Sequence, residues 1–329
     1  MSAWPLPLVS VIIPVRDGER WIAETIESVL MQTYGALEII VVDNGSTDGT
    51  RSIVRRYPTI RVIEVATPGL GRARNRGLDA ATGKYVLFLD GDDLILPNKI
   101  ERQVEILETT RADVAWEPFQ MYVPEAGGRY LRGRVVRPQI GADPAASVLT
   151  AEGWLQVAAM LIRRRAIGDL RFDETPGVFE DTAFNLLLAT RGARFVQSGH
   201  EAGFLYREHD GPRLSRRSPA AFAMACADNA TRAYKLWSEG GTLTAERRNA
   251  VAATYIFAAR QLSSSDRAAF DAIAERLAEV DPDFVDKLPT RVRWIAKLVG
   301  YSGAERVAVA YRELKARVGV AGDEEAHAP

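Results

Sequence analysis

Residues 85–93 read YVLFLDGDD, in which five apolar or aromatic residues are followed by three carboxylates within four positions. A continuous apolar run such as Tyr85–Leu89 predicts a β-strand that is covered on both faces. The acidic run Asp90-Gly91-Asp92-Asp93 begins where this strand ends. Because ligands of parallel sheets bind beyond the carboxyl ends of the strands, this position marks the run as a candidate site.

Three neighbouring carboxylates repel one another, so such a cluster is costly unless a cation neutralises it. A divalent cation does this and can also bind a diphosphate. The alternative is an ordinary turn, because Asp and Gly are common in turns. The apolar strand directly before the cluster favours a metal site.

The residues around this stretch alternate between strand and helix patterns. Strands are predicted at Val9–Val15, Leu37–Val42 and Ile60–Val65, and helices at Glu19–Gln32, Thr47–Tyr57, Gly71–Ala81 and Pro97–Leu107. This alternation predicts βαβ units. We therefore expect an α/β fold with a mainly parallel sheet that is flanked by helices.

The pattern changes along the rest of the chain. Predicted strands are Asp113–Val123, Tyr130–Val136, Val157–Arg163, Phe195–Gln197 and Gly203–Arg207, with a helix at Glu180–Thr190. Beyond Pro219 the sequence is helical and rich in alanine, which predicts a C-terminal helical bundle with helices near Ala221–Glu239, Ala245–Leu262, Ala268–Val280, Arg291–Val299 and Ala304–Val318. We expect a catalytic domain at 1–215, a helical domain at 216–321 and a disordered tail at 322–329.

Composition excludes several classes of protein. With 329 residues, 47% of them hydrophobic and 26% charged, the chain is neither disordered nor collagen-like. A net charge of −1 gives no basic field, so we expect no nucleic-acid partner. One cysteine, Cys226, and three histidines are too few for an internal disulfide or the usual zinc site. A metal would rest on carboxylates, which select Mn²⁺ or Mg²⁺.

The N-terminal stretch MSAWPLPLVSVIIPV has no basic region, and its apolar run ends at Arg16-Asp17, so we predict a strand and no signal peptide. No apolar run approaches the roughly 20 residues that span a membrane. We expect a cytoplasmic protein, or one peripheral to the inner membrane face. The basic segment Arg291–Val299 carries Trp294 and is compatible with surface attachment, although a packed helix is the favoured interpretation. A homodimer would form through the C-terminal helices.

Two further loops carry polar groups near predicted strand ends. Asp43 can accept a hydrogen bond from a base N–H or a ribose hydroxyl, although a helix-capping loop explains this residue better when it is taken alone. The segment Thr67–Asn75 leads into a helix and can meet phosphate through backbone N–H groups and arginines. A plain turn explains that segment equally well. It does not match GxGxxG, because Arg74 follows where the third glycine would be, and the chain has no P-loop motif.

Four stretches, taken together and in order, resemble the family 2 glycosyltransferases of the GT-A fold. They read PVRDGERWIAETIESVLMQTY, EIIVVDNGSTDGT, GLGRARNRGLDAATGKYVLFLDGDD and FEDTAFNLLLATRG. The resemblance covers about residues 8–210 and does not extend to the helical C-terminal part. It implies an inverting, metal-dependent enzyme that uses a nucleotide-sugar donor.

The resemblance also implies roles for single residues in the donor site. Asp43 would bind uracil or an equivalent base, and Asp92 would ligate the metal. Asp93 would support the site or contact the donor sugar. Nucleotide-binding positions implied in the same way are Pro14, Val15, Arg16, Asp17, Asp48, Arg74, Asp90 and Gly91.

Glu180-Asp181 resembles the acidic pair of this family, in which the aspartate is the catalytic base. Transfer with inversion needs one base to take the proton of the acceptor hydroxyl, and no second carboxylate as nucleophile. The metal acts as the Lewis acid that stabilises the leaving diphosphate. The alternative is an acidic pair that is favoured only by the dipole at a helix N-terminus.

The segment Tyr206–Asp210 resembles a tyrosine-arginine-x-histidine segment that often ends this catalytic domain. The resemblance implies that His209 reaches the metal or the diphosphate, and that Arg207 or Arg213 meets the phosphate charge. The loop His209–Ser218 can order over a bound donor. Trp154 is our candidate for the acceptor side, because aromatic faces pack well on sugar rings.

We therefore predict an inverting transferase that moves a sugar from a nucleotide diphosphate, with UDP as the expected carrier, to a hydroxyl acceptor. The acceptor would be a cell-surface polysaccharide, a glycolipid or a natural product. A nucleotidyltransferase is the enzymatic alternative, but it would have a triphosphate loop rich in glycine and lysine where this chain has PVRDGERW. A non-catalytic scaffold with the same fold is the other alternative, and the intact acidic clusters argue against it.

Overall fold

Seven strands form the main sheet, in the order β10-β6-β9-β4-β1-β2-β3. The computed structural model describes residues 6–125, 129–175, 179–209, 219–287, 290, 292–298 and 300–305. The strands of the main sheet are β1 (Val9–Val15), β2 (Leu37–Asp43), β3 (Arg61–Glu64), β4 (Tyr85–Phe88), β6 (Val114–Trp116), β9 (Met160–Arg163) and β10 (Phe195–Gln197). Every residue of β1 is buried, as its continuous apolar sequence predicts.

The main sheet is largely parallel, which confirms the predicted fold class. β1 pairs in parallel with both β2 and β4, β2 with β3, and β6 with β10. Only β9 runs against its neighbours β4 and β6 within the described sheet. In this register Val15 lies opposite Asp43, so the polar residues that follow β1 and β2 come to the same edge.

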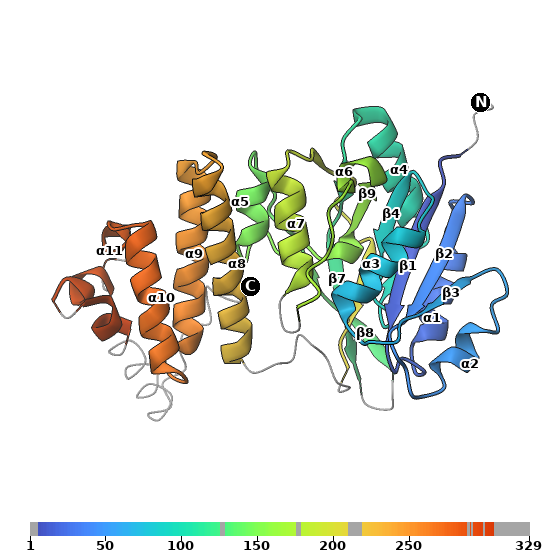
Figure 1. The fold of residues 1–329 in the computed structure, drawn as a ribbon, viewed down its shortest axis with the longest axis horizontal. Helices are drawn as coiled ribbons and strands as arrows, with labels where there is room; N and C mark the ends of the chain where they lie inside the picture. The colour runs from blue at the N-terminus through green and yellow to red at the C-terminus, as the bar shows by residue number, and fades with distance from the viewer. Residues whose placement is uncertain are drawn as a thin grey trace. The chain divides into compact units, whose positions relative to one another are not determined.

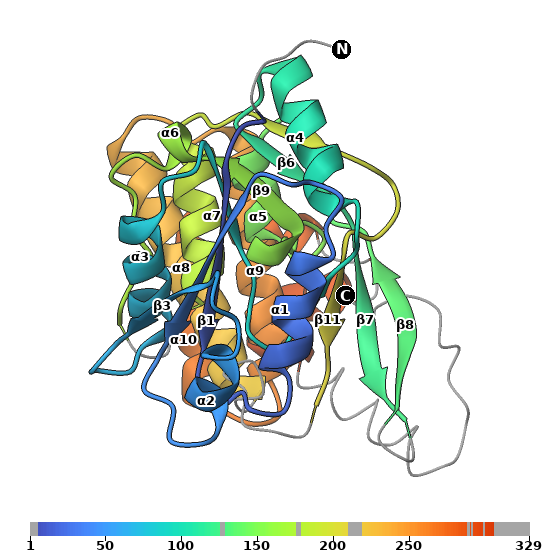
Figure 2. The same cartoon turned by 90° about the vertical axis from the view of Figure 1, so that its right-hand side faces the viewer.

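Helices cover both faces of this sheet. Figure 2 shows α3 and α1 on opposite sides of β1. Gly77 of α3 lies so close to the sheet that a Cβ atom there would be 2.2 Å from Ile12 Cγ2, which explains how tightly this helix packs. The helices of this part are α1 (Ile22–Leu30), α2 (Thr50–Val54), α3 (Leu70–Ala80), α4 (Lys99–Thr110), α6 (Arg164–Ile167) and α7 (Glu180–Thr190), with a 3₁₀ turn η1 (Val157–Ala159) before β9.

A second sheet of four strands has the order β5-β11-β7-β8. Its strands are β5 (Leu94–Ile95), β7 (Phe119–Pro124), β8 (Tyr130–Val136) and β11 (Phe204–Arg207). The prediction of one strand over Asp113–Val123 is wrong, because this stretch forms β6 and β7 in different sheets. The break falls at Glu117-Pro118, where proline has no N–H to donate to a sheet ladder.

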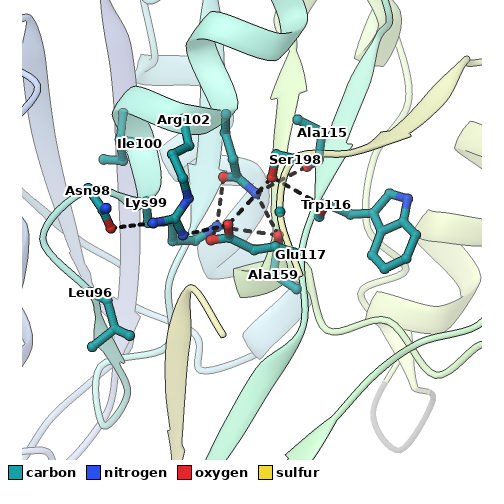
Figure 3. A network of polar contacts seen from close by, with 12 residues as sticks. Leu96, Asn98, Lys99, Ile100, Arg102, Ala115, Trp116, Glu117, Ala159 and Ser198 are labelled. Carbon is teal, nitrogen blue, oxygen red and sulfur yellow. Dashed lines mark hydrogen bonds and ion pairs between the residues drawn. The ribbon is translucent and has the colours of Figure 1, made fainter. Parts of the chain in front are cut away.

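A buried polar network holds the seam between the two sheets (Figure 3). Lys99 and Glu117 are both fully buried, with 3.5 Å between Lys99 Nζ and Glu117 Oε1. Arg102 donates to Glu117 Oε2 at 2.8 Å, and Lys99 donates to Gln103 Oε1 at 2.7 Å. Burial lowers the pKa of Lys99 to about 8. The network ties the start of α4 to the point where the chain leaves β6.

The chain divides into two compact units, Met1–Ile140 with Leu155–Gly211, and Gly141–Trp154 with Pro212–Pro329. The segment Gly141–Trp154 therefore belongs to the second unit, which differs from the predicted boundary near residue 215. Figure 1 shows the helices of the second unit as coiled ribbons. They are α5 (Pro144–Leu149), α8 (Pro219–Glu239), α9 (Ala245–Leu262), α10 (Arg267–Val280) and α11 (Phe284–Lys287).

Specific contacts bring α5 onto α9. Asp143 caps α5 by accepting from Ala145 N, and it also pairs with Arg247 of α9 at 2.7 Å. Thr254 Oγ1 donates to Leu149 O at 3.0 Å. Alanines in α8 and α9 are buried, which lets these helices approach closely. The sequence pattern predicts the bundle itself but does not indicate α5.

The last described residues, 292–298 and 300–305, are helical. Trp294 and Leu298 on this helix are 67% and 83% exposed. The predicted helix Ala304–Val318 and the tail 322–329 lie outside the described residues, except for Ala304 and Glu305. No helix in the described ranges combines the length and apolar character needed to cross a membrane.

Candidate active site

The ends of β1, β2 and β4 meet at one edge of the main sheet. Asn44 N donates to Val15 O at 2.8 Å, and Gly91 N donates to Pro14 O at 3.2 Å. A Cβ atom on Gly91 would lie 2.8 Å from Val15 Cβ, so only glycine permits this approach. The structure thus brings together Pro14, Val15 and Gly91, which the sequence assigns to nucleotide binding.

The loops that follow β1 and β2 are linked to each other by hydrogen bonds. Asp17 has a positive φ of 50°, and its Oδ1 accepts from Thr47 N at 2.7 Å. Asp48 Oδ2 accepts from Glu19 N at 3.0 Å, while Arg16 remains half-exposed beside Asp17. The carboxylates of Asp17 and Asp48 therefore hold the two loops together, a function that their predicted role in nucleotide binding did not include.

Asp43 ends β2 and is nearly buried, with 2% of its side chain exposed. Its Oδ1 accepts from Ser46 N at 3.0 Å, and its Oδ2 pairs with Nε of Arg51. Sequence reasoning missed Arg51, although an arginine in the helix directly after the Asp43 loop is a visible signal. These two partners hold the carboxylate at the edge of the main sheet where β1, β2 and β4 end, which we call the nucleotide edge.

Arg74 joins the carboxylates of two distant segments. Its side chain is 2% exposed, and it donates to Asp90 Oδ1 at 2.7 Å and to Glu180 Oε1. Its guanidinium also lies 5.3 Å from the ring of Phe172. The predicted acidic residues Asp90 and Glu180 are thereby brought together from β4 and α7, with one buried cation between them.

Burial disfavours ionisation of the acidic pair that begins α7. Desolvation raises the pKa of Glu180 to about 7, even though Arg74 opposes this shift. Desolvation also raises the pKa of Asp181, again against the effect of Arg74. A carboxylate whose pKa lies near the working pH is suited to accept a proton from a hydroxyl group. The raised pKa values of this pair and the contact of Glu180 with Arg74 are compatible with a general base beside the strand-end site.

The acidic loop after β4 is held by residues at the end of β11. His209 is 3% exposed, and its Nε2 lies 2.8 Å from Asp92 Oδ2. Arg207 N donates to Asp93 Oδ1 at 2.8 Å, and Arg207 Nε donates to Asp92 O at 2.7 Å. The predicted neighbours Asp92, Asp93 and His209 thus form one cluster.

Arg207 contacts a carboxylate of α1 and two tyrosine rings in addition to the acidic loop. Besides Asp92 and Asp93, its guanidinium pairs with Glu24 of α1 at 2.6 Å. It also lies 5.3 Å and 4.9 Å from the rings of Tyr122 and Tyr130. These contacts link Arg207 to the acidic loop, to α1 and to β7 and β8. Its predicted role toward the diphosphate stays a prediction.

Trp21 is a further residue at this cluster that sequence reasoning did not assign to the site. Its ring lies 4.0 Å from the ring of His209, with an angle of 31° between the planes. Arg20 lies over the ring of Trp21, with its guanidinium carbon 5.5 Å from the ring centroid. The indole therefore limits the orientations of His209, and so helps to keep Nε2 at Asp92.

Two pockets border α3 and share Arg72 and Arg76. One has a volume of about 420 Å³ and is lined by these residues with Asn75, Asp79, Arg171, Phe172 and Glu174. The other, about 720 Å³, lies against residues 63–67 at the end of β3. Val65 N donates to Asp43 O, so this second pocket begins beside the strand end that carries Asp43. Of the arginines in the predicted segment Thr67–Asn75, Arg72 lines both pockets and Arg74 lines neither.

Comparison with known proteins identifies this arrangement. Residues 10–170 match the family model described as glycosyl transferase family 2. Through this segment, the chain belongs to that family. The chain is similar to EpsJ of Bacillus subtilis, named an uncharacterized glycosyltransferase, at 35% identity over 218 residues, which are 62% of each chain. It is also 33% identical over 168 residues to YibD of Escherichia coli, covering 48% of this chain and 49% of YibD. The chain thus spans less than two thirds of these relatives.

Solved structures with the same fold extend over most of the chain. TarS 1–349 of S. aureus in complex with UDP-GlcNAc matches with a TM-score of 0.67 and 21% identity, covering 93% of this chain and 92% of TarS. The mannosyltransferase PcManGT from Pyrobaculum calidifontis, in complex with GDP-Man and Mn²⁺, matches with a TM-score of 0.51 and 20% identity over 94% and 87%. These matches confirm the predicted GT-A fold of this family 2 protein.

The acidic loop offers few protein donors to a divalent cation. No group of three or more His, Cys, Asp or Glu side chains is placed to hold a metal within the described ranges. Asp92 and His209 do offer two adjacent donors. Mg²⁺ in such enzymes is held by one or two carboxylates together with substrate phosphates and water. The pair therefore fits a cation that is shared with a diphosphate, and does not fit one enclosed by protein groups.

Two predicted site residues stay outside this assembly. Trp154 belongs to the second compact unit, where Trp154 N donates to Ala151 O at 3.3 Å. Arg213 lies outside the described residues. The roles of Trp154 toward an acceptor and of Arg213 toward the diphosphate stay predictions.

Proposed function

We propose that the protein transfers a sugar from a nucleotide diphosphate to a hydroxyl acceptor, with inversion at the anomeric carbon. The observation that carries this proposal is the chain of side chains from Asp90 through Arg74 to Glu180. It places Glu180, the neighbour of the candidate general base Asp181, on the same buried cation as a carboxylate of the nucleotide edge. A site that only bound nucleotides would not need the raised pKa of the acidic pair.

In this proposal Asp181 takes the proton of the acceptor hydroxyl while the oxygen attacks the anomeric carbon. The bond from that carbon to the diphosphate oxygen breaks, and the nucleoside diphosphate leaves with the bonding electrons. The new glycosidic bond is complete when the proton rests on the Asp181 carboxylate. A cation at Asp92 and His209 would supply Lewis-acid stabilisation of the leaving diphosphate. No protein nucleophile is needed, because the acceptor attacks directly.

Neighbouring groups of this chain prepare that step. Arg74 holds Glu180 and Asp90 in place, and its charge limits how far burial raises the pKa of Asp181. Arg207 and His209 orient the acidic loop through Asp92 and Asp93. We propose Mn²⁺ or Mg²⁺ as the cation, because a carboxylate and an imidazole with phosphate oxygens suit these ions.

UDP is the carrier that we propose for the donor. TarS, which shares the fold, was solved with UDP-GlcNAc. The nearly buried carboxylate of Asp43 at the nucleotide edge can accept from the ring N–H of uracil. A cytoplasmic location, an acceptor among surface polysaccharides, glycolipids or natural products, and a homodimer stay proposals of the same kind.

Two measurements on the full chain test the function. Titration calorimetry with UDP, GDP and dTDP, each with and without Mn²⁺, should show binding that is strengthened by the metal. If no nucleotide binds with any metal, the transferase proposal fails. In a sugar-transfer assay, Asp181→Asn should retain donor binding and lose roughly 10²–10⁴-fold in turnover. Asp169→Asn, which changes a carboxylate that is 87% exposed and pairs with Arg191, is the matched control and should retain activity.

A further inference from the structure

One face of the second sheet carries a row of basic and aromatic side chains that leads away from the acidic loop. Arg207 of β11 lies opposite Tyr122 of β7, and Tyr122 lies opposite Arg132 of β8. Residues paired in neighbouring strands point to the same face of a sheet, and so do residues two positions apart in one strand. Tyr130 therefore shares this face with Arg132. Figure 2 shows β11, β7 and β8 side by side, with β8 at the outer edge.

The two tyrosines form an aromatic surface between the arginines. The ring centroids of Tyr122 and Tyr130 are 5.0 Å apart, with an angle of 28° between the ring planes. Both residues are half-buried, so part of each side chain is accessible to a ligand. Tyrosine combines an apolar ring with a polar hydroxyl group, which suits the C–H groups and hydroxyl groups of a sugar.

The two arginines differ in how their charges are balanced. Arg207 is buried, and its guanidinium binds Asp92 O and the carboxylate of Glu24. Arg132 is exposed, and its side chain forms no ion pair with any residue that the structure describes. The stretch 129–137 reads RYLRGRVVR, with four arginines and no acidic residue, so the strand itself supplies no counter-ion. Arg132 is therefore a cation available to a ligand.

We propose that Tyr122, Tyr130 and Arg132, which we call the β8 surface, bind the sugar acceptor. The acceptor carries an anionic group, a carboxylate or a phosphate, near the hydroxyl group that reacts. The planar guanidinium of arginine binds either group through two parallel hydrogen bonds. The inference rests on the proposed function, because it takes the cluster of Asp92 and His209 to be the place of sugar transfer.

The position of the β8 surface agrees with an acceptor. Neighbouring strands lie about 4.8 Å apart, so the backbone of Arg132 is about 10 Å from that of Arg207, which holds the acidic loop. The nucleotide edge lies at β1, β2 and β4, and both views show β8 away from α2, the helix after the Asp43 loop. A ligand on the β8 surface is thus near the acidic loop and remote from the base.

Arg132 also has a purely structural explanation. Charged side chains on an edge strand prevent this strand from pairing with another copy of the chain. In that case Arg132→Gln would promote self-association in size-exclusion chromatography and would leave the affinity for sugars unchanged. A guanidinium that binds the acceptor gives the opposite result, because its removal weakens the binding of anionic sugars alone.

The experiment measures the binding of three oligosaccharides to the full chain by calorimetry in metal-free buffer. The probes are hexagalacturonate, which carries carboxylates, phosphorylated maltohexaose, and the neutral methyl ester of hexagalacturonate. The wild-type protein should bind at least one anionic probe roughly tenfold more tightly than the neutral ester, as one charged hydrogen-bonded contact predicts. The probe that binds identifies the anionic group. UDP binding is measured separately in the presence of Mn²⁺.

Two variants and a control locate the binding to the β8 surface. Arg132→Gln should lower the affinity for the anionic probe about tenfold and leave UDP binding unchanged, which also shows that the variant is folded. Tyr130→Leu should weaken the anionic and neutral probes by the same factor, roughly 2–10-fold, because it removes an aromatic contact and no charge. Arg165→Gln removes an equal charge from α6 at a residue that is 73% exposed, and should change no affinity.

The outcomes separate this inference from the proposed function. If UDP binds and neither anionic probe binds more tightly than the ester, the inference fails and the proposed function stands. Equal losses in Arg132→Gln and Arg165→Gln would also overturn it, because they show attraction by overall charge only. Binding of anionic lipid vesicles through Arg132, without binding of either sugar, would assign the surface to a membrane. If an anionic sugar binds but UDP does not, the acceptor role fails together with the proposed function.

Discussion

Arg74 is the single residue on which the charge balance of the candidate site depends. Its buried guanidinium faces Asp90 and Glu180 directly, and Asp181 is close enough to affect its pKa. Removing a cation from a buried cluster leaves uncompensated charge, which is more costly than the loss of a surface pair.

We expect Arg74→Met to lower the free energy of unfolding by about 3–5 kcal/mol in urea denaturation at neutral pH. Arg171→Met removes a half-exposed partner of Asp79 and should cost at most about 1 kcal/mol. Equal losses in the two variants would show that Arg74 is not a buried counter-ion.

Glu180 makes both stability and activity depend on pH. Its pKa is raised from 4.5 to about 7, so the folded chain holds a proton that the unfolded chain loses between these values. The stability contribution is complete below pH 4.5 and is lost as the pH rises through about 7, by roughly 3 kcal/mol. We expect Glu180→Gln to flatten this slope in unfolding curves measured from pH 4.5 to 8.

The raised pKa of Asp181, the proposed base, should appear in catalysis. A general base must be ionised before it can take a proton, so kcat/KM should rise with pH through a pKa above that of an ordinary aspartate and then level off. A profile that is flat from pH 5.5 to 8.5 would separate the acidic pair from the proton transfer.

Some of the site could be predicted at the scale of residues, and some could not. Asp43, Asp90 and Asp92 follow apolar strands, so their gathering at one edge follows from the parallel fold. The contact of Arg74 with Glu180 joins residues 106 positions apart, and no local pattern indicates it. The contacts of Arg207 likewise depend on where β11 pairs in the second sheet, which the sequence does not reveal.

Strand β11 begins where the buried Glu117 carboxylate lies. A Cβ atom on Gly203 would be 1.3 Å from Glu117 Oε1, and Glu117 is held by Lys99 and Arg102. Gly203→Ala should therefore force the carboxylate out of its network and lower the free energy of unfolding by about 3 kcal/mol.

Gly35→Ala is the control for this substitution, because nothing lies within 4 Å of the added Cβ atom. Its effect should stay within about 0.5 kcal/mol. Melting of the Gly203 variant at the wild-type temperature would show that the network adapts without cost. β11 leads to Arg207 and His209, so Mn²⁺ binding to the Gly203 variant should weaken as well.

At the scale of elements, apolar runs predict strands well but not the sheets in which they pair. Asp113–Val123 contains apolar and aromatic residues on both sides of Glu117-Pro118, so a single strand was the simplest interpretation. The polar residue and the proline mark the true break between β6 and β7. Helix α5 escaped prediction for another reason, because six residues are too few to show a helical period.

At the scale of the whole molecule, the second unit is built from two separate parts of the chain. A chain that ends after Gly211 would keep α5 but lose α9, which contributes Arg247 to Asp143 and Thr254 to Leu149. The buried side chains of α5, among them Ala145 and Leu149, would then be exposed. We expect this truncated chain to aggregate and to bind a hydrophobic dye.

The matched control is a second truncated chain that also ends after Gly211 and has a flexible linker of equal length in place of residues 141–154. This control lacks α5 together with the rest of the second unit. It should remain monomeric in size-exclusion chromatography and unfold in one cooperative transition. If both truncated chains behave alike, α5 does not depend on α9.

Contact of the exposed Trp294 and Leu298 with membranes stays a prediction, to be tested by liposome flotation of the full chain.

The separation of α5 from its partner also has a consequence during synthesis on the ribosome. Leu149 and Thr254, which share a hydrogen bond in the finished protein, are 105 residues apart. At about 5–20 residues per second, α5 leaves the exit tunnel about 5–20 s before α9 can cover it. For that interval its apolar side chains are available to chaperones and to other nascent chains. Slow codons between α5 and α9 should therefore lower the yield of soluble protein more than the same codons placed before α5.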